Sequence, residues 1–391
     1  MTDGQPLGST ASLASRLRDN VLQPVKKVLV GKDEIVEVLG VSLVAGENLF
    51  LLGPPGTGKS ALVKEVASRL SGNAFDYLLT RFTEPSELFG PFDLRKLKDG
   101  ELVTNTEGML PEADFVFLDE LLNANSAILN SLLLALNERI FRRGRQTIQL
   151  PMLLTVGASN RLPDDDALAA LFDRFLLRVV CDNVSDDGLE SVLQAGWQRE
   201  SADPPPIGMP IDELKELRQR TLHVDLSPVR DAYLKLIRSL RLAGMPISDR
   251  RAVRLQRVIA ASAILCGRES ADVSDLWIVR YIWDTPAQAE LLASHIDSVS
   301  AEHTSESVEQ GISRHPLSQM DSGVDPETLV KAIEMITADI RHPAAADQLS
   351  LLAARVEWVN NEVARDDLRQ RIGDVREQLR TFASEASSGK T

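Results

Sequence analysis

Short, continuous apolar runs mark the first half of the chain, and polar residues follow each of them. Three runs cover residues 49–52, 115–118 and 153–158, and a fourth at 176–180 follows a helix-prone stretch. An unbroken apolar run of this length is typical of a strand that is buried on both faces of a parallel sheet. We therefore expect an α/β domain at residues 19–200, with polar residues gathered at the carboxyl ends of its strands, where open α/β sheets bind ligands.

The second half of the chain changes to a helical pattern. Residues 203–208 read Asp-Pro-Pro-Pro-Ile-Gly, which cannot form the interior of a helix and indicates a linker. Beyond this linker, Pro228 opens one helix, Gly244 ends it, and residues 250–266 form another. We expect residues 207–290 to fold as an all-α lid.

The two ends of the chain differ from these domains. Residues 1–18 are rich in Gly, Ser, Thr and Ala and are expected to form a flexible tail. Residues 295–321 are rich in Ser, His, Glu and Gly, which predicts a linker that is loop or poorly ordered. Residues 325–385 repeat apolar positions at 4-3-4 spacing, so we expect a helical hairpin, joined at Pro343, that packs on itself or on a partner. The repeated positions are Leu329, Ile333, Ile336 and Ile340, then Leu352, Val356, Val359 and Val363, and finally Leu368, Ile372, Val375 and Leu379.

The most informative motif follows the first apolar run. Residues 53–60 read Gly-Pro-Pro-Gly-Thr-Gly-Lys-Ser before a helix-prone segment, which is the context that the phosphate-binding pattern G-x-x-x-x-G-K-[ST] requires. Glycines let several backbone N–H groups converge on one anion, and the positive end of the following helix adds to that field. Lys59 would neutralise the outer phosphates of ATP, and the Ser60 hydroxyl would ligate Mg²⁺. The predicted nucleotide-binding residues of this loop are Gly53, Pro54, Pro55, Gly56, Thr57, Gly58, Lys59, Ser60 and Ala61.

Polar residues at the ends of the second and third runs complete this prediction. Asp119 and Glu120 follow the second run, where Asp119 would hold the Mg²⁺ shell and Glu120 would polarise the attacking water as general base. Asn160 follows the third run, and its amide would reach the γ-phosphate or the water from a neighbouring strand.

Arg174 lies where a short helix meets the fourth run. Its guanidinium has two alternatives. It can form an ion pair with Asp173 inside its own subunit, or it can enter the nucleotide site of a neighbouring subunit and stabilise transition-state charge.

Composition limits the classes of protein that remain. The 391-residue chain is 43% hydrophobic, yet no apolar run approaches the roughly 18 to 20 residues that cross a bilayer. Its start lacks the basic and apolar segments of a secretory signal, so we expect a cytoplasmic protein. Cys181 and Cys266 are too few for a disulfide framework or a zinc site and are expected in the core. The net charge of −14 disfavours nucleic acid as a partner.

These motifs form a series. GPPGTGKS, VFLDE, GASN and LFDRF, at residues 53–60, 116–120, 157–160 and 171–175, resemble the AAA+ ATPases, and within them the MoxR family in its RavA-like branch. The resemblance covers residues 25–285. It implies an AAA+ αβα sandwich with a parallel sheet, followed by an all-α lid and, in this chain, by a C-terminal helical segment. RavA-like proteins can carry a β-rich domain in their C-terminal half, and nothing here has the alternating pattern to match it.

Two further segments narrow the resemblance. Asp99 and Gly100 form a turn signal between short β-prone runs, inside what would otherwise be a helix. Such an insert is typical of MoxR proteins, magnesium chelatases and their relatives. Residues 139–150 read as a second hairpin with Gly144 at its tip, similar to the hairpin before sensor 1 in this clade. Its four arginines either point into the pore of a ring or protect an exposed sheet edge.

The resemblance also implies roles for the polar residues. Lys59 and Ser60 match the Walker A positions, Asp119 and Glu120 match the Walker B pair, and Asn160 matches sensor 1.

Other implied roles concern arginines and one glycine. Arg174 matches the arginine finger that is donated across a subunit boundary. The segment Ser248–Arg251 is similar to the RavA-like sensor 2, in which a lid arginine contacts the γ-phosphate of its own subunit. Arg250 is favoured for this role over Arg251, because it aligns with the arginine of the commoner Ser-Pro-Arg variant. Gly31 falls where the family packs its chain against the adenine.

The resemblance implies a Mg²⁺-dependent ATPase that assembles as a homo-oligomeric ring, expected to be a hexamer, and remodels or matures a client protein. It also suggests a partner with a von Willebrand factor A domain. The alternatives are a chelatase-like motor subunit for metal insertion and an interaction scaffold that binds nucleotide as a switch. A nucleic-acid motor is a further reading, which the acidic net charge disfavours.

Overall fold

The structure is a computed structural model. It describes residues 9–98, 102–143, 146–184, 186–200, 205–309 and 313–319, with residues 329–330, 333–334, 336–337, 349, 356 and 367–379 nearer the C-terminus. The chain divides into two compact units, Met1–Gln319 and Met320–Thr391.

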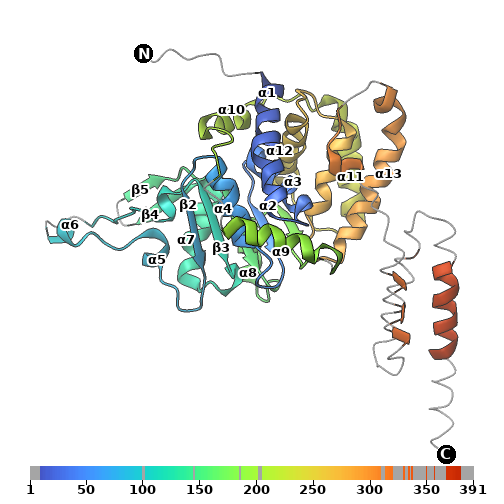
Figure 1. Cartoon of the computed structure of the whole chain (residues 1–391), viewed down its shortest axis with the longest axis horizontal. Coiled ribbons are helices and arrows are strands. Elements are labelled where there is room, and N and C mark those ends of the chain that lie inside the picture. The colour runs from blue at the N-terminus through green and yellow to red at the C-terminus, as the bar shows by residue number, and fades with distance from the viewer. Residues whose placement is uncertain are drawn as a thin grey trace, which may run out of the picture. The chain divides into compact units, whose positions relative to one another are not determined.

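A five-stranded parallel sheet organises the first unit (Figure 1). Its strand order is β2-β3-β6-β1-β7. The strands are β1 Leu49–Leu52, β2 Ala74–Leu78, β3 Phe115–Asp119, β6 Leu154–Ser159 and β7 Leu177–Val180. The four apolar runs are the four strands β1, β3, β6 and β7, so the predicted parallel sheet is confirmed. The strand β2 was not predicted, because its side chains alternate between exposed and half-buried positions at the edge of the sheet.

Helices cover the sheet in two groups. One group contains α2 Gln23–Val28, α3 Asp33–Ala45 and α4 Lys59–Arg69, in which α2 contacts both of the others. The other contains α7 Ser126–Glu138 and α8 Asp166–Phe172. Helix α9 Asp186–Glu200 follows β7 and contacts α2. Every residue of α3 from Ile35 to Ala45 is buried, because this helix packs against α12 of the lid as well as near the sheet. The predicted αβα sandwich is confirmed.

The expected flexible tail at residues 1–18 is wrong for its second half. Residues Thr10–Leu17 form the helix α1, which a π-helix at Arg18–Leu22 continues. The buried side chains of α1 are Thr10, Leu13, Ala14 and Leu17, which repeat at helical spacing. The Ser9 side chain accepts a hydrogen bond from the Ser12 amide and caps the helix. The Ser, Thr and Ala residues of this segment suggested disorder, whereas its apolar positions form the buried face of an amphipathic helix.

The lid is all helical, as predicted. Its elements are α10 Ile211–Thr221, α11 Arg230–Leu242, α12 Asp249–Leu265, a 3₁₀ helix at Val273–Tyr281, and α13 Gln288–Glu309. Figure 1 shows α11, α12 and α13 beside the sheet, on the side away from α6. The expected linker at residues 295–321 is wrong, since α13 continues to Glu309. Leu292, Ile296 and Val299 are buried at 4-3 spacing and hold this helix on the lid.

The segment after α13 is also anchored. His315 is 2% exposed and stacks on Trp277 with 4.3 Å between ring centroids. Its Nδ1 accepts a hydrogen bond from the Leu317 amide, and its Nε2 lies 3.1 Å from the buried Glu37 carboxylate. A buried histidine with both ring nitrogens paired fixes this segment on the body of the protein.

The two inserts of the α/β part pack on each other. The first contains α5 Pro85–Phe89 and α6 Leu94–Lys98, and among the described residues one antiparallel bridge, Phe92 to Thr104, joins its arms. The β-prone run expected before the Asp99 and Gly100 turn is wrong, since α6 is helical. Asp93 accepts hydrogen bonds from the amides of Arg95 and Lys96 and starts a helical turn instead. The turn at Asp99 and Gly100 lies outside the described residues.

The second hairpin is confirmed, with β4 Ile140–Arg143 antiparallel to β5 Gln146–Gln149. Its tip at Gly144 lies outside the described residues. Two of its arginines contact their own subunit. Arg143 donates to the Gly90 carbonyl and lies 3.9 Å from the centre of the Phe92 ring, and Arg139 donates to Asn48. Arg142 is exposed.

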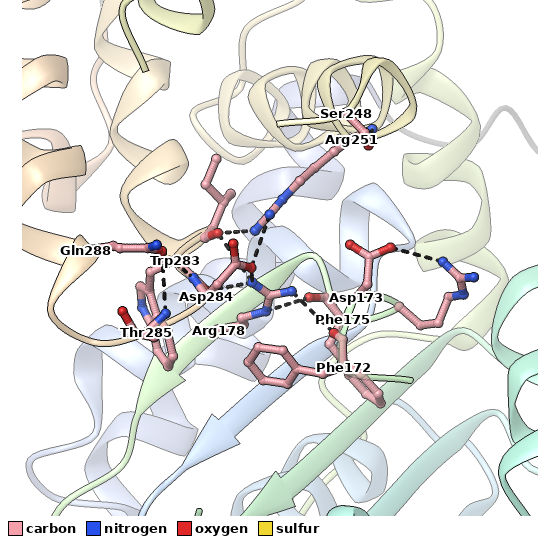
Figure 2. A network of polar contacts seen from close by, with 12 residues as sticks. Phe172, Asp173, Phe175, Arg178, Ser248, Arg251, Trp283, Asp284, Thr285 and Gln288 are labelled. Atoms are coloured by element: carbon pink, nitrogen blue, oxygen red, sulfur yellow. Dashed lines mark hydrogen bonds and ion pairs between the residues drawn. The ribbon is translucent and has the colours of Figure 1, made fainter. Parts of the chain in front are cut away.

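A buried cation joins the sheet to the lid. Arg178, in β7, is 1% exposed. Figure 2 shows Arg178 and Arg251 of α12 reaching the same carboxylate, that of Asp284. The carbonyl groups that accept hydrogen bonds from Arg178 are those of Phe172, Phe175, Ile282 and Trp283. Burial and then the charge of Arg251 lower the pKa of Arg178 to about 10, so it still carries its charge at neutral pH.

The second unit is helical where it is described. Its apolar side chains from both predicted arms form one buried cluster of Leu329, Ile333, Ile336, Leu349, Val356, Leu368, Ile372 and Val375. The helical hairpin at residues 325–385 stays a prediction, and its joint at Pro343 lies outside the described residues. Over the described part of the chain, no helix combines the length and the apolar character needed to span a membrane.

The Arg178 cluster makes a stability prediction. Arg178→Met removes the cation that satisfies four carbonyl groups and shares Asp284, and we expect the free energy of unfolding to fall by about 3–5 kcal/mol. Urea unfolding followed by tryptophan fluorescence measures this change. The matched control is Arg142→Met on the exposed face of β4, for which we expect a change within about 0.5 kcal/mol. Equal effects of the two substitutions would contradict the role of the cluster.

Candidate active site

The predicted phosphate loop connects β1 to α4. Gly56 and Gly58 have φ angles of 85° and 81°, in the left-handed region that favours glycine. No atom lies within 4 Å of the position that a Cβ would take at either residue, so the space beside the loop is open. Gly58 is the N-cap of α4 and provides no side chain to cap the first amides of the helix. These amides and the positive end of α4 are therefore available to an anion.

Lys59 is held inside this loop. Its ammonium donates to the carbonyls of Gly53 at 3.0 Å and Pro54 at 2.7 Å, and it lies 3.5 Å from the Thr57 hydroxyl. The residue is only 6% exposed. A cation at the centre of a loop of backbone amides suits a polyphosphate. Ser60 and Ala61 follow in the first turn of α4.

The predicted acids lie at the same edge of the sheet as this loop. In the sheet register, Leu52 pairs with Ser159 of β6, and Leu118 pairs with Gly157. The ends of β1, β3 and β6 therefore form one edge, which we name the carboxyl edge. Asp119 ends β3, two strands away from β1, which corresponds to about 10 Å between the two backbones.

Glu120 has an unusual backbone conformation. Its φ is 49° and its ψ is 42°, a left-handed conformation that is costly for a residue with a side chain. Its amide donates to the Asp119 carboxylate at 3.0 Å, and both acids are half-buried. Strained residues of this kind cluster at functional sites, where the surrounding structure holds them.

Asn160 lies between the loop and the acids. It is exposed and follows Ser159, whose carbonyl accepts a hydrogen bond from the Gly53 amide at 3.0 Å. The next residue, Arg161, donates to the Leu122 carbonyl just beyond Glu120 and to Asp164. Sequence reasoning missed Arg161, which ties the end of β6 to the segment that carries Glu120.

The residues present fit a magnesium nucleotide. Within the described ranges, no group of three or more His, Cys, Asp or Glu side chains is arranged to hold a metal by itself. Mg²⁺ typically takes one or two protein oxygens, with water and substrate phosphates as its other ligands. Ser60 and Asp119 at one edge of the sheet match that need, together with an open loop that can hold the phosphates.

Gly31 is connected to the same loop. Its φ is 73°, and a Cβ at this position would lie 2.8 Å from the Val184 side chain. Val184 follows Cys181, whose amide donates to the Leu52 carbonyl directly before the loop. Gly31 thus lies close to the segment that follows β7 and that contacts the end of β1 just before the phosphate loop, and its predicted contact with adenine stays a prediction. Cys181 and Cys266 are buried, as expected.

Arg174 lies at the opposite edge of the sheet. Its carbonyl accepts a hydrogen bond from the Asn48 side chain at 3.1 Å, and Asn48 directly precedes β1. Leu49 pairs with Leu177 in the register, so the starts of β1 and β7 form what we name the amino edge. The four residues of β1 separate this edge from the phosphate loop by about 13 Å.

The Arg174 guanidinium forms the predicted ion pair. It donates to Asp173 at 3.0 Å, with the Asp173 side chain 55% exposed and that of Arg174 20% exposed. Its Nε is buried and has no hydrogen-bond partner among the residues that the structure describes. An ion pair with so exposed a carboxylate is worth little, so this pairing leaves Arg174 free to exchange Asp173 for another anion.

The two candidates for sensor 2 have different surroundings. Arg251 is 6% exposed and is bound to Asp284 in the buried cluster of Figure 2. Arg250 donates to Asn137 at 2.9 Å. Arg250 lies one turn before Arg254 on α12, and Arg254 donates to the Arg174 carbonyl at 3.4 Å, so Arg250 lies at the amino edge. Burial and then the charge of Arg250 lower the pKa of Arg174. The phosphate loop lies at the other edge, and the expected contact of Arg250 with the γ-phosphate of its own subunit stays a prediction.

Comparisons with known proteins agree with this geometry. The family model described as the MoxR domain in the MoxR-vWA-beta-propeller ternary systems matches residues 15–219, more than half of the chain. A second model, described as an AAA lid domain, matches residues 229–296. A solved structure of a presumed ATPase from Cytophaga hutchinsonii superposes with a TM-score of 0.58 at 19% identity, covering 68% of this chain and 84% of that one. This last likeness concerns the fold alone.

Two relatives show how far the similarity extends. An uncharacterized protein of Methanocaldococcus jannaschii is 35% identical over 295 residues, which are 75% of this chain and 78% of the relative. The chaperone MoxR1 of Mycobacterium tuberculosis is 26% identical over 180 residues, which are 44% of this chain and 47% of that relative. The chain belongs to the MoxR family of AAA+ ATPases.

Proposed function

We propose that this protein is a Mg²⁺-dependent ATPase that works as a ring and couples hydrolysis to the remodelling or maturation of a partner protein. One observation carries the proposal. The phosphate loop, the two acids and Asn160 lie at the carboxyl edge, whereas Arg174 lies at the amino edge, about 13 Å away along β1. Arg174 cannot complete its own site from there. It can complete the site of a neighbour whose carboxyl edge faces it.

The residues at the carboxyl edge have distinct tasks. Lys59 and the first amides of α4 bind the phosphates and fix their orientation. Glu120 accepts a proton from the attacking water, which Asn160 helps to position. Ser60 and Asp119 would hold Mg²⁺, which when bound would offset the charge of the phosphate oxygens. Arg174 of the neighbouring subunit adds a positive charge where negative charge develops in the transition state.

The partner class is the second part of the proposal. The matching family model names MoxR domains that occur with von Willebrand factor A proteins, and one relative is named a chaperone. We therefore propose a partner with a von Willebrand factor A domain and a hexameric ring as the working form. The RavA-like branch, the same-subunit role of sensor 2 and the chelatase-like alternative stay predictions.

A scaffold that only binds nucleotide is the competing function. It requires no general base and no residue from a neighbour. The strained backbone at Glu120 favours the motor, because such strain is kept where a side chain must be aimed.

Glu120→Gln tests the chemical step. The glutamine keeps the shape of the side chain but cannot accept the proton, so we expect kcat to fall by about 10²- to 10⁴-fold while Mg·ATP still binds. Phosphate release measures turnover, and calorimetry measures binding. The matched control is Glu107→Gln, an exposed acid of the first insert, for which both values should stay at the wild-type level. Wild-type turnover in Glu120→Gln would remove Glu120 from its role and favour the scaffold.

Arg174→Ala tests the division between subunits. We expect normal Mg·ATP binding and a kcat lower by about 10³-fold or more. Mixing these subunits with Lys59→Ala subunits should restore turnover, because the first supply intact loops and the second supply intact arginines. Turnover of the wild type should also rise steeply with protein concentration as rings form. If Arg174→Ala fails to fold, or if mixing restores nothing, Arg174 is only the ion-pair partner of Asp173.

A further inference from the structure

The residue that holds Arg174 in place lies at the start of the strand that carries the phosphate loop. Asn48 is 2% exposed and donates from Nδ2 to the Arg174 carbonyl at 3.1 Å. Five residues later the chain enters the phosphate loop at Gly53. The single strand β1 thus connects the nucleotide site of this subunit with the base of the arginine that we assign to the neighbour's site.

The chemistry of its partners fixes the orientation of the Asn48 amide. Arg139 donates to Asn48 Oδ1 at 3.0 Å, and a guanidinium can only donate. The carbonyl of Arg174 can only accept. The oxygen of the Asn48 side chain must therefore face Arg139, and its nitrogen must face Arg174. The side chain thus accepts on one side and donates on the other.

A lid residue supports the same carbonyl. Arg254 of α12 donates to the Arg174 carbonyl at 3.4 Å and forms an ion pair with Glu47, which is 4% exposed. Glu47 directly precedes Asn48. The lid and the start of β1 therefore meet at the backbone of Arg174.

Positive charges gather around the Arg174 side chain. The charges of Arg250 and Arg254 lower the pKa of its guanidinium, and the exposed Asp173 carboxylate raises it. Repulsion between guanidinium groups makes a nearby anion favourable for Arg174. The hydrogen bonds from Asn48 and Arg254 hold the main chain from which its side chain extends.

We propose that Asn48, supported by Arg254, is a positioning residue that aims Arg174 into the neighbouring subunit's nucleotide site and couples that aim to the phosphate loop of its own subunit through β1. The proposal rests on the proposed function, since it assigns Arg174 to a neighbour. Asn48 itself touches no nucleotide.

Asn48→Asp tests this inference with the least change of shape. The carboxylate still accepts from Arg139 but cannot donate to the Arg174 carbonyl. We expect kcat to fall by about 10- to 100-fold, as for a misplaced catalytic group, while Mg·ATP affinity stays at the wild-type value. Mixing with Lys59→Ala subunits, which have an intact Asn48 and Arg174, should raise turnover above that of either variant alone. The matched control Asn105→Asp, an exposed asparagine of the first insert, should behave as the wild type.

The outcomes separate this inference from the proposed function. Wild-type kcat in Asn48→Asp overturns the inference. The inference is also overturned if Lys59→Ala subunits restore the turnover of Arg174→Ala but not that of Asn48→Asp. Failure of both mixtures overturns the proposed function and the inference with it.

If Asn48→Asp does not fold, Arg254→Lys provides the test, because lysine keeps the ion pair with Glu47 but loses the guanidinium fork that also reaches Arg174. It should then show a lower kcat that mixing restores, and an unchanged kcat counts against the inference.

Discussion

The parallel pairing of β1 between β6 and β7 is the constraint on which the rest of the structure depends. Parallel strands bring all their carboxyl ends to one edge, and β1, β6 and β3 end there in a phosphate loop, a polar amide and two acids. The same pairing sends the start of β7, with Arg174 just before it, to the other edge. Whatever Arg174 does, the sheet keeps it apart from the loop of its own subunit.

The lid is attached to the α/β part at two places through arginines. Arg251 reaches the cluster around Asp284 and Arg178 beside the middle of β7, and Arg254 reaches Glu47 before β1. These contacts are of different kinds. The first is a buried cluster whose cations are 6% and 1% exposed, and so it makes the position of the lid costly to change. The second ends at the Arg174 carbonyl, and so it lets the lid influence the direction of that arginine.

Much of the site could be predicted from the sequence because its signals are local. A continuous apolar run followed by a polar residue predicts both a buried strand and the edge where its functional residue lies, as for Asp119 and Asn160. The strand β2 has no such run, because an edge strand buries only part of its surface. The helix α1 and the end of α13 were missed for another reason. Ser, Ala and Thr suggested disorder, although Leu13, Leu17 and Ile296 provide the apolar spacing that holds a helix on a body.

The sequence could not predict which residues far apart in the chain contact one another. A strand reading Leu-Arg-Val-Val hints that Arg178 is buried, but nothing local names Asp284, which is 106 residues away. Asn48 and Glu47 look like turn residues before a strand, and their contacts with Arg139, Arg174 and Arg254 appear only in the fold. The distinction between Arg250 and Arg251 has the same origin, since adjacent residues on a helix point in different directions. One is therefore buried with Asp284, and the other lies beside Arg174.

The distribution of charge fits the proposed assembly, in which the amino edge of one copy faces the carboxyl edge of the next. The chain carries a net charge of −14, so copies of it repel one another at long range. Against that background, arginines gather at the amino edge near the buried acid Glu47. These arginines are Arg139, Arg174, Arg250 and Arg254. Such a concentration of positive charge is unfavourable in an isolated subunit unless an anion approaches it.

A triphosphate held at the carboxyl edge of a neighbour is an anion of suitable charge. An arrangement in which each edge faces the opposite edge of the next copy is head-to-tail, and contacts of this type close into rings. In this arrangement the nucleotide would not only be the substrate but would also neutralise the surface between two subunits.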